Sequence, residues 1–232
     1  MTIDAALTFP EDEVRHPGRH EVVEAVYARG EERIPVVVKK VRLAAGRDRA
    51  ARSYEVARAL LSRGIDTPEP LGVDRVGKEG WYVARKLEGA DQIRSWFLRR
   101  DGAAGRAPSH PYAFEEIVAA LARLARRLHD SGVFFRDFTD GNVLVTEGET
   151  GPRLWLVDLD RARIQPGPLP ARLRYRDLAR PGLNRREDLN LLLAKYFEPD
   201  RIPSSAAFLV PLLRRRTVLW DAFKAFVRPW RK

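Results

Sequence analysis

Several acidic and amide side chains lie close together in the sequence between residues 134 and 160. Asp137 is followed by Asn142, and a predicted β-hairpin then leads to Asp158 and Asp160 at the end of its second strand. Carboxylate and amide oxygens are the ligands that Mg²⁺ takes from proteins. Because Asn142 leaves a loop and Asp158 leaves the strand that follows it, we expect both side chains to point to one common place.

The stretch reads F-R-D-x-x-x-x-N and then D-L-D, whereas the kinase catalytic loop reads H-R-D-x-x-x-x-N and then D-F-G. Phosphoryl transfer requires a protein to position a nucleophile and to neutralise charge on the phosphates. The spacing therefore predicts that Asp137 orients the attacking hydroxyl and that Asn142 and Asp158 bind magnesium. Asp160 is a further candidate metal ligand. Asp160 could instead pair with one of the two arginines that follow it. An ordinary hairpin with acidic ends is the alternative for the whole stretch, since Asp, Asn and Gly favour turns in any protein.

Residues 22–27 and 34–41 are predicted to form two strands joined by a turn at Gly30. The second strand contains V-V-V-K-K, which is close to V-A-I-K, where a strand lysine grips the α- and β-phosphates of ATP. Lys39 has the register of that motif. Lys40 would then face the other way, because side chains alternate along a strand.

Residues 47–63 are predicted to form a helix that stops at Gly64. The apolar positions that indicate its core face are Ala50, Tyr54, Ala57 and Leu61. Glu55 stands on this helix, where kinases supply the glutamate that orients the strand lysine over the phosphates. The alternative is that Glu55 is a surface residue. Upstream, residues 15–20 hold one glycine, Gly18, in place of the glycine-rich loop of protein kinases.

The chain is predicted to divide into a first lobe, residues 1–88, and a second lobe, residues 89–232. Residues 81–85 are predicted to form a strand, and residues 85–89 would be the hinge between the lobes. Beyond the hinge, residues 95–109 are rich in glycine and charge and are predicted to be irregular.

The clearest helix in the sequence opens at Pro111, because apolar residues recur after it at intervals of three and four. His129 lies near its end and is assigned to capping or packing rather than to catalysis. Residues 188–197 are predicted to form a further helix. A last helix is predicted to begin around Pro211, since proline suits a first helical turn.

The composition restricts the class of protein. A chain of 232 residues fits one large domain or two small lobes. It has no cysteine, which excludes disulfides and thiolate metal sites and fits a reducing compartment. No secretory signal and no membrane span are predicted from the apolar pattern. The net charge of +10 favours an anionic partner, either a phosphorylated substrate, an acidic membrane surface or nucleic acid, and a solvated basic surface is the alternative.

Three phrases carry a resemblance to a known family, and they are L-H-D-S-G-V at residues 128–133, R-D to N-V-L at residues 136–144 and L-V-D-L-D-R-A-R at residues 156–163. With the Lys39 strand, the chain resembles the lipopolysaccharide core kinases, the Kdo/heptose kinases of Gram-negative bacteria. The resemblance spans roughly residues 15 to 190. Its most specific residue is Asp160, where most protein kinases have glycine.

The resemblance implies a compact, two-lobed α+β fold of the protein-kinase-like type, with a β-rich first lobe and a mostly helical second lobe. It also implies that the protein uses ATP and Mg²⁺ to phosphorylate a sugar hydroxyl, on Kdo or heptose, in the lipid A–inner core of lipopolysaccharide. In this interpretation Lys39, Glu55, Asn142 and Asp158 bind the cofactors. The protein would be cytoplasmic, with peripheral association at the inner face of the inner membrane, and no nucleic acid partner is expected.

Two other functions compete with the sugar kinase. One is a small protein-serine kinase or small-molecule phosphotransferase of the same fold, and the other is a non-catalytic binding protein. The acidic and amide groups that a metal site needs are present, which speaks against the binding protein. The chain has no A-P-E motif and a short remainder after its catalytic motifs, which speaks against a protein kinase. The cationic substrates of antibiotic phosphotransferases suit this basic chain poorly.

Basic residues are concentrated after the catalytic motifs. Eight arginines lie between residues 161 and 186. Arginine binds phosphate and carboxylate groups through two parallel hydrogen bonds, so Arg172, Arg174 and Arg176 are predicted to bind a polyanionic acceptor. The chain ends in R-P-W-R-K, residues 228–232, which is predicted to add anchoring to an acidic membrane surface. The sequence does not specify which sugar or which hydroxyl is phosphorylated.

Overall fold

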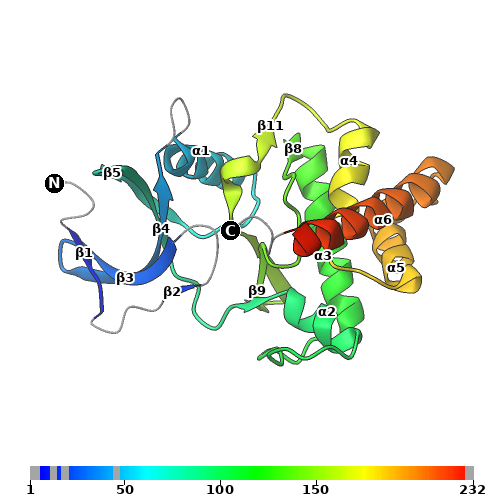
Figure 1. Ribbon diagram of the computed structural model, residues 1–232, viewed down its shortest axis with the longest axis horizontal. Helices are drawn as coiled ribbons and strands as arrows, with labels where there is room; N and C mark the ends of the chain where they lie inside the picture. Colours follow the sequence, from blue (N-terminus) through cyan, green and yellow to red (C-terminus); the bar gives the residue numbers. More distant parts are fainter. Residues whose placement is uncertain (1–5, 11–14, 17–20, 44–47, 228–232) are drawn as a thin grey trace. The chain divides into compact units, whose positions relative to one another are not determined.

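The computed structural model describes residues 6–10, 15–16, 21–43 and 48–227, and the chain divides into two compact units (Figure 1). The first unit comprises residues 1–89 and 155–160, and the second comprises residues 90–154 and 161–232. Strands dominate the first unit and helices dominate the second, so the predicted α+β class is confirmed. The sequence assigned residues 155–160 to the second lobe, whereas they group with the first unit.

The first unit is built on one antiparallel sheet with the order β1-β3-β4-β6-β5, and β2 also pairs with β3. Its elements are β1 (Leu7–Thr8), β2 (Arg15–His16), β3 (Glu21–Arg29), β4 (Glu32–Arg42), α1 (Arg49–Leu61), β5 (Pro70–Val76) and β6 (Glu79–Arg85). Helix α1 packs on β4, β5 and β6. The strand predictions around residues 22–27, 34–41 and 81–85 are confirmed.

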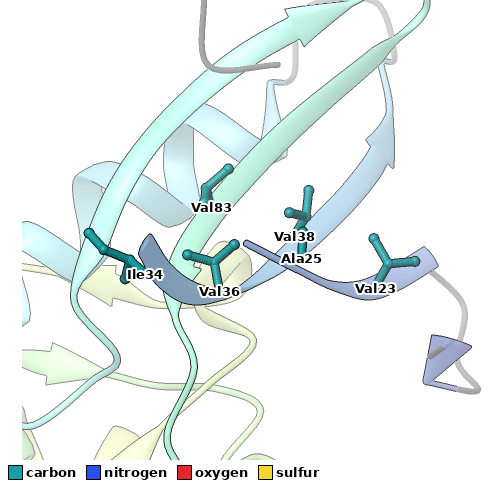
Figure 2. Packing of buried hydrophobic residues seen from close by; sticks show 6 residues of the cluster. All are labelled: Val23, Ala25, Ile34, Val36, Val38 and Val83. Atoms are coloured by element: carbon teal, nitrogen blue, oxygen red, sulfur yellow. The ribbon is translucent and has the colours of Figure 1, made fainter. Parts of the chain in front are cut away.

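Alternation along β3 and β4 produces the core of this unit. The strands form a hairpin in which Val22 pairs with Lys39, and Gly30 turns the chain with a φ of 65°, which glycine adopts without steric cost. Alternate side chains are buried on one face at Val23 and Ala25 of β3 and at Ile34, Val36 and Val38 of β4. Figure 2 shows the resulting cluster of Val23, Ala25, Ile34, Val36, Val38 and Val83. Burying each of its larger members contributes about 1.5–3 kcal/mol, which fixes the register of Lys39.

Helix α1 forms as predicted, but its rotation about its own axis differs from the prediction. The Asp48 side chain accepts a hydrogen bond from the Ala51 N–H at 2.9 Å and caps the N-terminus. The residues that the helix buries are Ala50, Ser53, Val56, Ala57 and Leu60. Leu61, which the sequence placed on the core face, is 39% exposed. The buried stripe thus contains Ser53 and Val56 in place of Tyr54 and Leu61.

The second unit combines short strands with five helices in its described part. Its elements are β7 (Asp91–Gln92), α2 (Arg94–Arg100), α3 (Phe114–Asp130), β8 (Val133–Phe134), β9 (Val143–Gly148), β10 (Gly151–Leu156), η2 (Leu159–Arg161), β11 (Arg163–Ile164), α4 (Ala171–Leu178), α5 (Arg186–Phe197) and α6 (Ser204–Val227), of which the end of β10 and most of η2 group with the first unit. Helix α3 packs against α5, and α6 packs against α4 and α5 (Figure 1). Strands β7, β9 and β10 form one small sheet, and β8 pairs with β11.

Three predictions about this unit are wrong or incomplete. Helix α2 occupies part of the segment 95–109 that the sequence indicated as irregular, because Trp96 and Phe97 are buried there. Helix α6 begins at Ser204 rather than near Pro211, and Pro211 lies inside it. Helix α4 was not predicted, because Arg172, Arg174 and Arg176 recur at every second residue and not at the helical period of 3.6 residues.

Candidate active site

Asp137 lies in the loop between β8 and β9, and the backbone before it has an unusual conformation. Arg136 has a φ of 68°, in the left-handed region that a residue with a side chain seldom adopts. The Asp177 carboxylate of α4 holds this backbone, because Oδ2 accepts the Phe135 N–H at 2.8 Å and Oδ1 accepts the Arg136 N–H at 2.9 Å. Strained backbone persists only where its surroundings fix it, and here one carboxylate does so.

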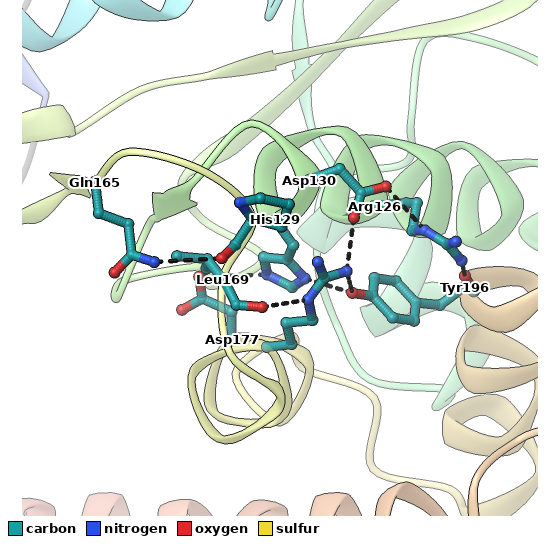
Figure 3. A network of polar contacts seen from close by, with 9 residues as sticks. Arg126, His129, Asp130, Gln165, Leu169, Asp177 and Tyr196 are labelled. Atoms are coloured by element: carbon teal, nitrogen blue, oxygen red, sulfur yellow. Dashed lines mark hydrogen bonds and ion pairs between the residues drawn. The ribbon is translucent and has the colours of Figure 1, made fainter.

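Asp177 is fully buried and belongs to a polar network within the second unit (Figure 3). Its Oδ2 lies 3.6 Å from Nε2 of His129, and Nδ1 of His129 is 2.8 Å from the Tyr196 hydroxyl. Burial raises the pKa of the Asp177 carboxyl, and the contact with His129 and the two backbone N–H donors oppose that shift. His129 therefore has a packing role, as predicted, and it supports the residue that holds the catalytic loop.

Both oxygens of the Asp137 carboxylate bind arginines. Nη1 of Arg161 donates to Oδ2 at 3.0 Å, and Nη2 of Arg180 donates to Oδ1 at 2.8 Å. Nδ2 of Asn142 donates to the backbone carbonyl of Asp137 at 2.9 Å, which ties the two motif residues together. A carboxylate has about four acceptor positions, so Asp137 keeps capacity for a hydroxyl proton while the arginines fix its orientation.

In the first unit, Nζ of Lys39 forms an ion pair with Oδ1 of Asp158. Lys40 faces the other way, because its Nζ donates to Oε1 of Glu21 at 3.1 Å and lies 5.1 Å from the centre of the Trp81 ring. Asp158 has a φ of 61°, and among the described residues it shares positive φ with Arg136 alone outside glycine. The structure therefore settles the strand register, and both strained residues stand at motif positions.

Glu55 and Asp160 differ in their surroundings. Glu55 is exposed on the side of α1 that faces away from the buried stripe, and the partner of Lys39 is Asp158. The predicted pair of Lys39 and Glu55 is not formed, for the same reason that the rotation of α1 differs from the prediction. Asp160 is nearly buried, and its Oδ2 lies 3.7 Å from Nε of Arg49.

The three arginines that were predicted to bind the acceptor lie on α4 and differ in their surroundings. Arg174 is tied within the protein, because it donates to the carbonyl of Leu169 at 2.8 Å and to Oδ1 of Asp130 at 2.7 Å. The guanidinium of Arg176 lies 5.6 Å from the centre of the Phe134 ring. Arg172 is exposed. Arg174 thus has a structural role that spacing along the sequence did not reveal.

The donor set fits magnesium in its chemistry. Asn142 uses its amide N–H₂ on the protein, which leaves the amide oxygen as the group that could bind a cation. Asp158 uses Oδ1 on Lys39, which leaves Oδ2. Both are hard oxygen ligands of the kind that Mg²⁺ takes together with phosphate oxygens. In the described part of the chain, no three or more His, Cys, Asp or Glu side chains gather as a metal cluster.

Two features of the sequence lie outside the described residues. They are the segment around Gly18, where protein kinases have a glycine-rich loop, and the terminal run of residues 228–232.

A strand lysine, a catalytic loop and an aspartate after the following hairpin occur here in the order of protein-kinase-like folds. The fold agrees with this class, since the chain is similar to the solved structure of WaaP in complex with acyl carrier protein. That likeness has a TM-score of 0.57 at 21% identity and covers 98% of this chain and 91% of the other. The model of the lipopolysaccharide kinase (Kdo/WaaP) family matches residues 13–194, and the chain belongs to this family.

Curated relatives match a little over half of the chain. A 3-deoxy-D-manno-octulosonic acid kinase of Xanthomonas campestris pv. campestris strain B100 is 31% identical over 138 residues, which is 59% of this chain and 49% of the relative. The protein of the same name from Xanthomonas axonopodis pv. citri is 29% identical over 138 residues, with the same coverage of both chains. The chain thus matches about half the length of these relatives.

Proposed function

We propose that this protein transfers the γ-phosphoryl group of ATP to a sugar hydroxyl, on Kdo or heptose, of a lipid A–inner core precursor of lipopolysaccharide. The observation that carries the proposal is the Asp137 loop, whose carboxylate and backbone are both fixed by contacts from other segments. Membership of the lipopolysaccharide kinase family supports the sugar acceptor. The shared name of the Xanthomonas relatives points to the same class of acceptor.

Each motif residue has a role in this reaction. The acceptor oxygen attacks the γ-phosphorus, the bond from that phosphorus to the β,γ-bridging oxygen breaks, and ADP leaves. The carboxylate of Asp137 orients the acceptor hydroxyl and takes its proton. Lys39 neutralises charge on the phosphates, and Asp158 holds its ammonium group in place. Asn142 and Asp158 would hold magnesium, which supplies positive charge to the β- and γ-phosphate oxygens.

We propose further that the protein acts at an acidic membrane surface, since the acceptor is lipid-linked. The support is helix α6. One side of α6 is buried through Ala206 and Val210. The opposite side exposes apolar residues at intervals of four and seven, which are Phe208, Leu212, Leu219 and Phe223. The most exposed of these, Phe208, has 69% of its surface accessible.

The charge of α6 supports an anionic bilayer as the surface on which this side of the helix docks. Arg215 and Arg216 are exposed on α6, and residues 204–232 contain seven basic residues against one acid, Asp221. Apolar and aromatic side chains interleaved with arginine are typical of helices that lie in the plane of a membrane interface. Among the described residues, no helix has the length and apolarity that a membrane crossing requires. On the strength of its exposed apolar and basic side chains, we propose that α6 lies on the bilayer.

Vesicle sedimentation tests the membrane part of the proposal. Leu219→Glu should lower binding to vesicles that contain an anionic phospholipid, and added salt should lower binding of the unmodified protein. Val218→Glu is the matched control, because Val218 is exposed on a different side of the same turn. Equal binding to anionic and neutral vesicles, or equal loss in both variants, would show that α6 does not dock on an acidic surface.

Transfer of labelled phosphate tests the reaction. The unmodified protein with radiolabelled ATP and Mg²⁺ should label Kdo-containing lipid A and should not label a generic protein substrate. Asp137→Ala should lower the rate about 10²–10⁴-fold, the usual contribution of a general base, while ATP still binds. Labelling of the protein substrate alone would favour a small protein kinase. Near-normal turnover in Asp137→Ala would show that Asp137 is not the general base.

A further inference from the structure

A pocket of about 290 Å³ opens beside the catalytic loop, and residues of the second unit alone line it. The lining residues are Arg94, Phe97, Leu98, Asp101, Thr139, Asp140, Arg180, Gly182, Asn184, Arg214 and Thr217. Thr139 and Asp140 belong to the catalytic loop itself. Arg180 lines the pocket and also donates to the Asp137 carboxylate at 2.8 Å. Arg180 therefore connects the pocket to the proposed base, Asp137.

We infer that this pocket binds the acceptor sugar and holds an anionic substituent of that sugar on its arginines. The inference rests on the proposed function and deepens it, because it names the place and the chemistry of acceptor recognition. It also transfers the acceptor role from the arginines of α4, of which Arg174 is committed to internal contacts, to Arg94, Arg180 and Arg214.

The size and lining of the pocket suit one sugar residue. Its volume lies at the lower end of ligand pockets, which is enough for a sugar ring and too small for a lipid chain as well. Phe97 and Leu98 give it an apolar patch, against which the C–H face of a sugar can lie. Asp101, Asp140 and Asn184 offer acceptors for hydroxyl groups.

The polar side chains are held in place before any ligand arrives. Nε of Arg94 donates to Asp140 at 3.1 Å, and Nη2 of Arg214 donates to Asn184 at 2.8 Å. Gly182 makes the close packing possible, because a Cβ at this position would lie 2.8 Å from Oδ2 of Asp140. Preorganised donors lose little conformational entropy on binding, so the pocket is built for recognition.

The pocket is an acceptor site rather than an ATP site because of what lines it. Its lining offers arginines, carboxylates and an apolar patch, whereas Lys39 and Asp158, the residues proposed to handle phosphates and metal, belong to the first unit. Three arginines and two aspartates line it, so its net charge favours an anionic group on a polyhydroxylated ligand. A sugar carboxylate and a phosphate on the neighbouring sugar share this chemistry.

Two pocket variants and a control test the inference, with a deacylated, water-soluble Kdo-containing acceptor that excludes membrane effects. Arg214→Gln should raise the KM for this acceptor about tenfold or more, as expected for the loss of a hydrogen bond to a charged group. Thr217→Phe should do the same by filling the pocket. The Thr217 hydroxyl donates to the Leu213 carbonyl of its own helix at 3.0 Å, so the hydrogen bond lost in this variant is one within α6. Arg99→Gln is the control, since Arg99 is exposed on the helix that carries Arg94.

The KM for ATP should stay within about twofold of the unmodified value in all three variants, because a merely structural defect would also change kcat and ATP binding. Two further acceptors identify the anionic group, one with its carboxyl reduced and one with its phosphates removed. One of these two acceptors should have a higher KM than the complete acceptor with the unmodified protein and an unchanged KM with Arg214→Gln. That acceptor lacks the group that Arg214 binds.

The outcomes separate the inference from the proposed function. If the unmodified protein phosphorylates the acceptor and both pocket variants keep its KM, the acceptor binds elsewhere and the inference is overturned, while the proposed function stands. If the unmodified protein phosphorylates no Kdo-containing acceptor but transfers phosphate to another substrate, the proposed function itself has failed.

Discussion

Asp177→Asn should inactivate the protein without touching any residue proposed to contact substrate. The Asp177 carboxylate accepts the Phe135 N–H at 2.8 Å and the Arg136 N–H at 2.9 Å, and it is fully buried. Asparagine keeps one oxygen and places an NH₂ group opposite the other backbone N–H. One hydrogen bond to a charged acceptor is then lost, and two buried donors face each other.

The size of the effect follows from these contacts. Losing a charge-assisted hydrogen bond and leaving a buried donor unsatisfied costs about 2–4 kcal/mol of folding free energy. For a chain of 232 residues this corresponds to a fall in Tm of about 5–15 °C. Arg136 would also lose the contact that fixes its φ of 68°, and the Asp137 carboxylate would move with it. A displacement of about 1 Å typically costs about 10²-fold in rate.

The assay compares phosphate transfer to Kdo-containing lipid A, ATP affinity and thermal unfolding in the same preparations. We expect kcat to fall about 10²-fold while the KM for ATP stays near its unmodified value, since Lys39 and Asp158 are untouched. Asp130→Asn is the matched control. Asp130 also binds two arginines, but its side chain is 47% exposed, so its loss should cost less than about 1 kcal/mol. A normal kcat in a folded Asp177→Asn protein would refute the positioning role.

Three further predictions concern the first unit and the buried carboxyl. Lys39→Ala should weaken ATP binding about tenfold or more, as expected for a lost charge-assisted hydrogen bond. Lys40→Ala should change ATP binding little, because Lys40 pairs with Glu21. Equilibrium nucleotide binding measures both effects, and the reverse result would contradict the strand register. Asp158→Asn should abolish the Mg²⁺ dependence of ATP binding, measured by titration with and without the metal, and an unchanged dependence would place the metal elsewhere. Because burial raises the pKa of the Asp177 carboxyl, the folded protein binds this proton more tightly than the unfolded chain. The corresponding stability is present below the ordinary aspartate pKa and is lost as pH rises through the folded pKa. Denaturant unfolding across that range should show this decline in the unmodified protein and not in Asp177→Asn.

Local sequence determined the elements that carry the motifs. The alternation of residues 22–27 and 34–41 specifies a hairpin, and the structure shows its register, in which Lys39 pairs with Val22. The predicted hairpin after Asn142 forms as β9 and β10, and the helix after Pro111 forms as α3. These features depend on contacts between near neighbours in the chain, and spacing along the sequence records such contacts directly.

Only the tertiary structure decided which side chains surround Asp137. Arg161 and Arg180 were two arginines among eight, and Asp177 was an acid that interrupted them. Asp177 reaches the backbone of Phe135 across 42 residues of sequence. A hydrogen bond over that separation leaves no periodic pattern, because it depends on how α4 packs against α3 and β8 rather than on its own residues.

The direction of a side chain on a helix was also beyond the sequence. Glu55 stands on a correctly predicted helix, yet it points away from the sheet because α1 buries the stripe that contains Ser53. Arg174 lies in a basic run that resembles a binding surface, yet it is tied to Asp130 and Leu169 within the protein. Residue type and spacing determine which chemistry the chain can perform. The rotation of each helix against its neighbours decides which residues are available for it.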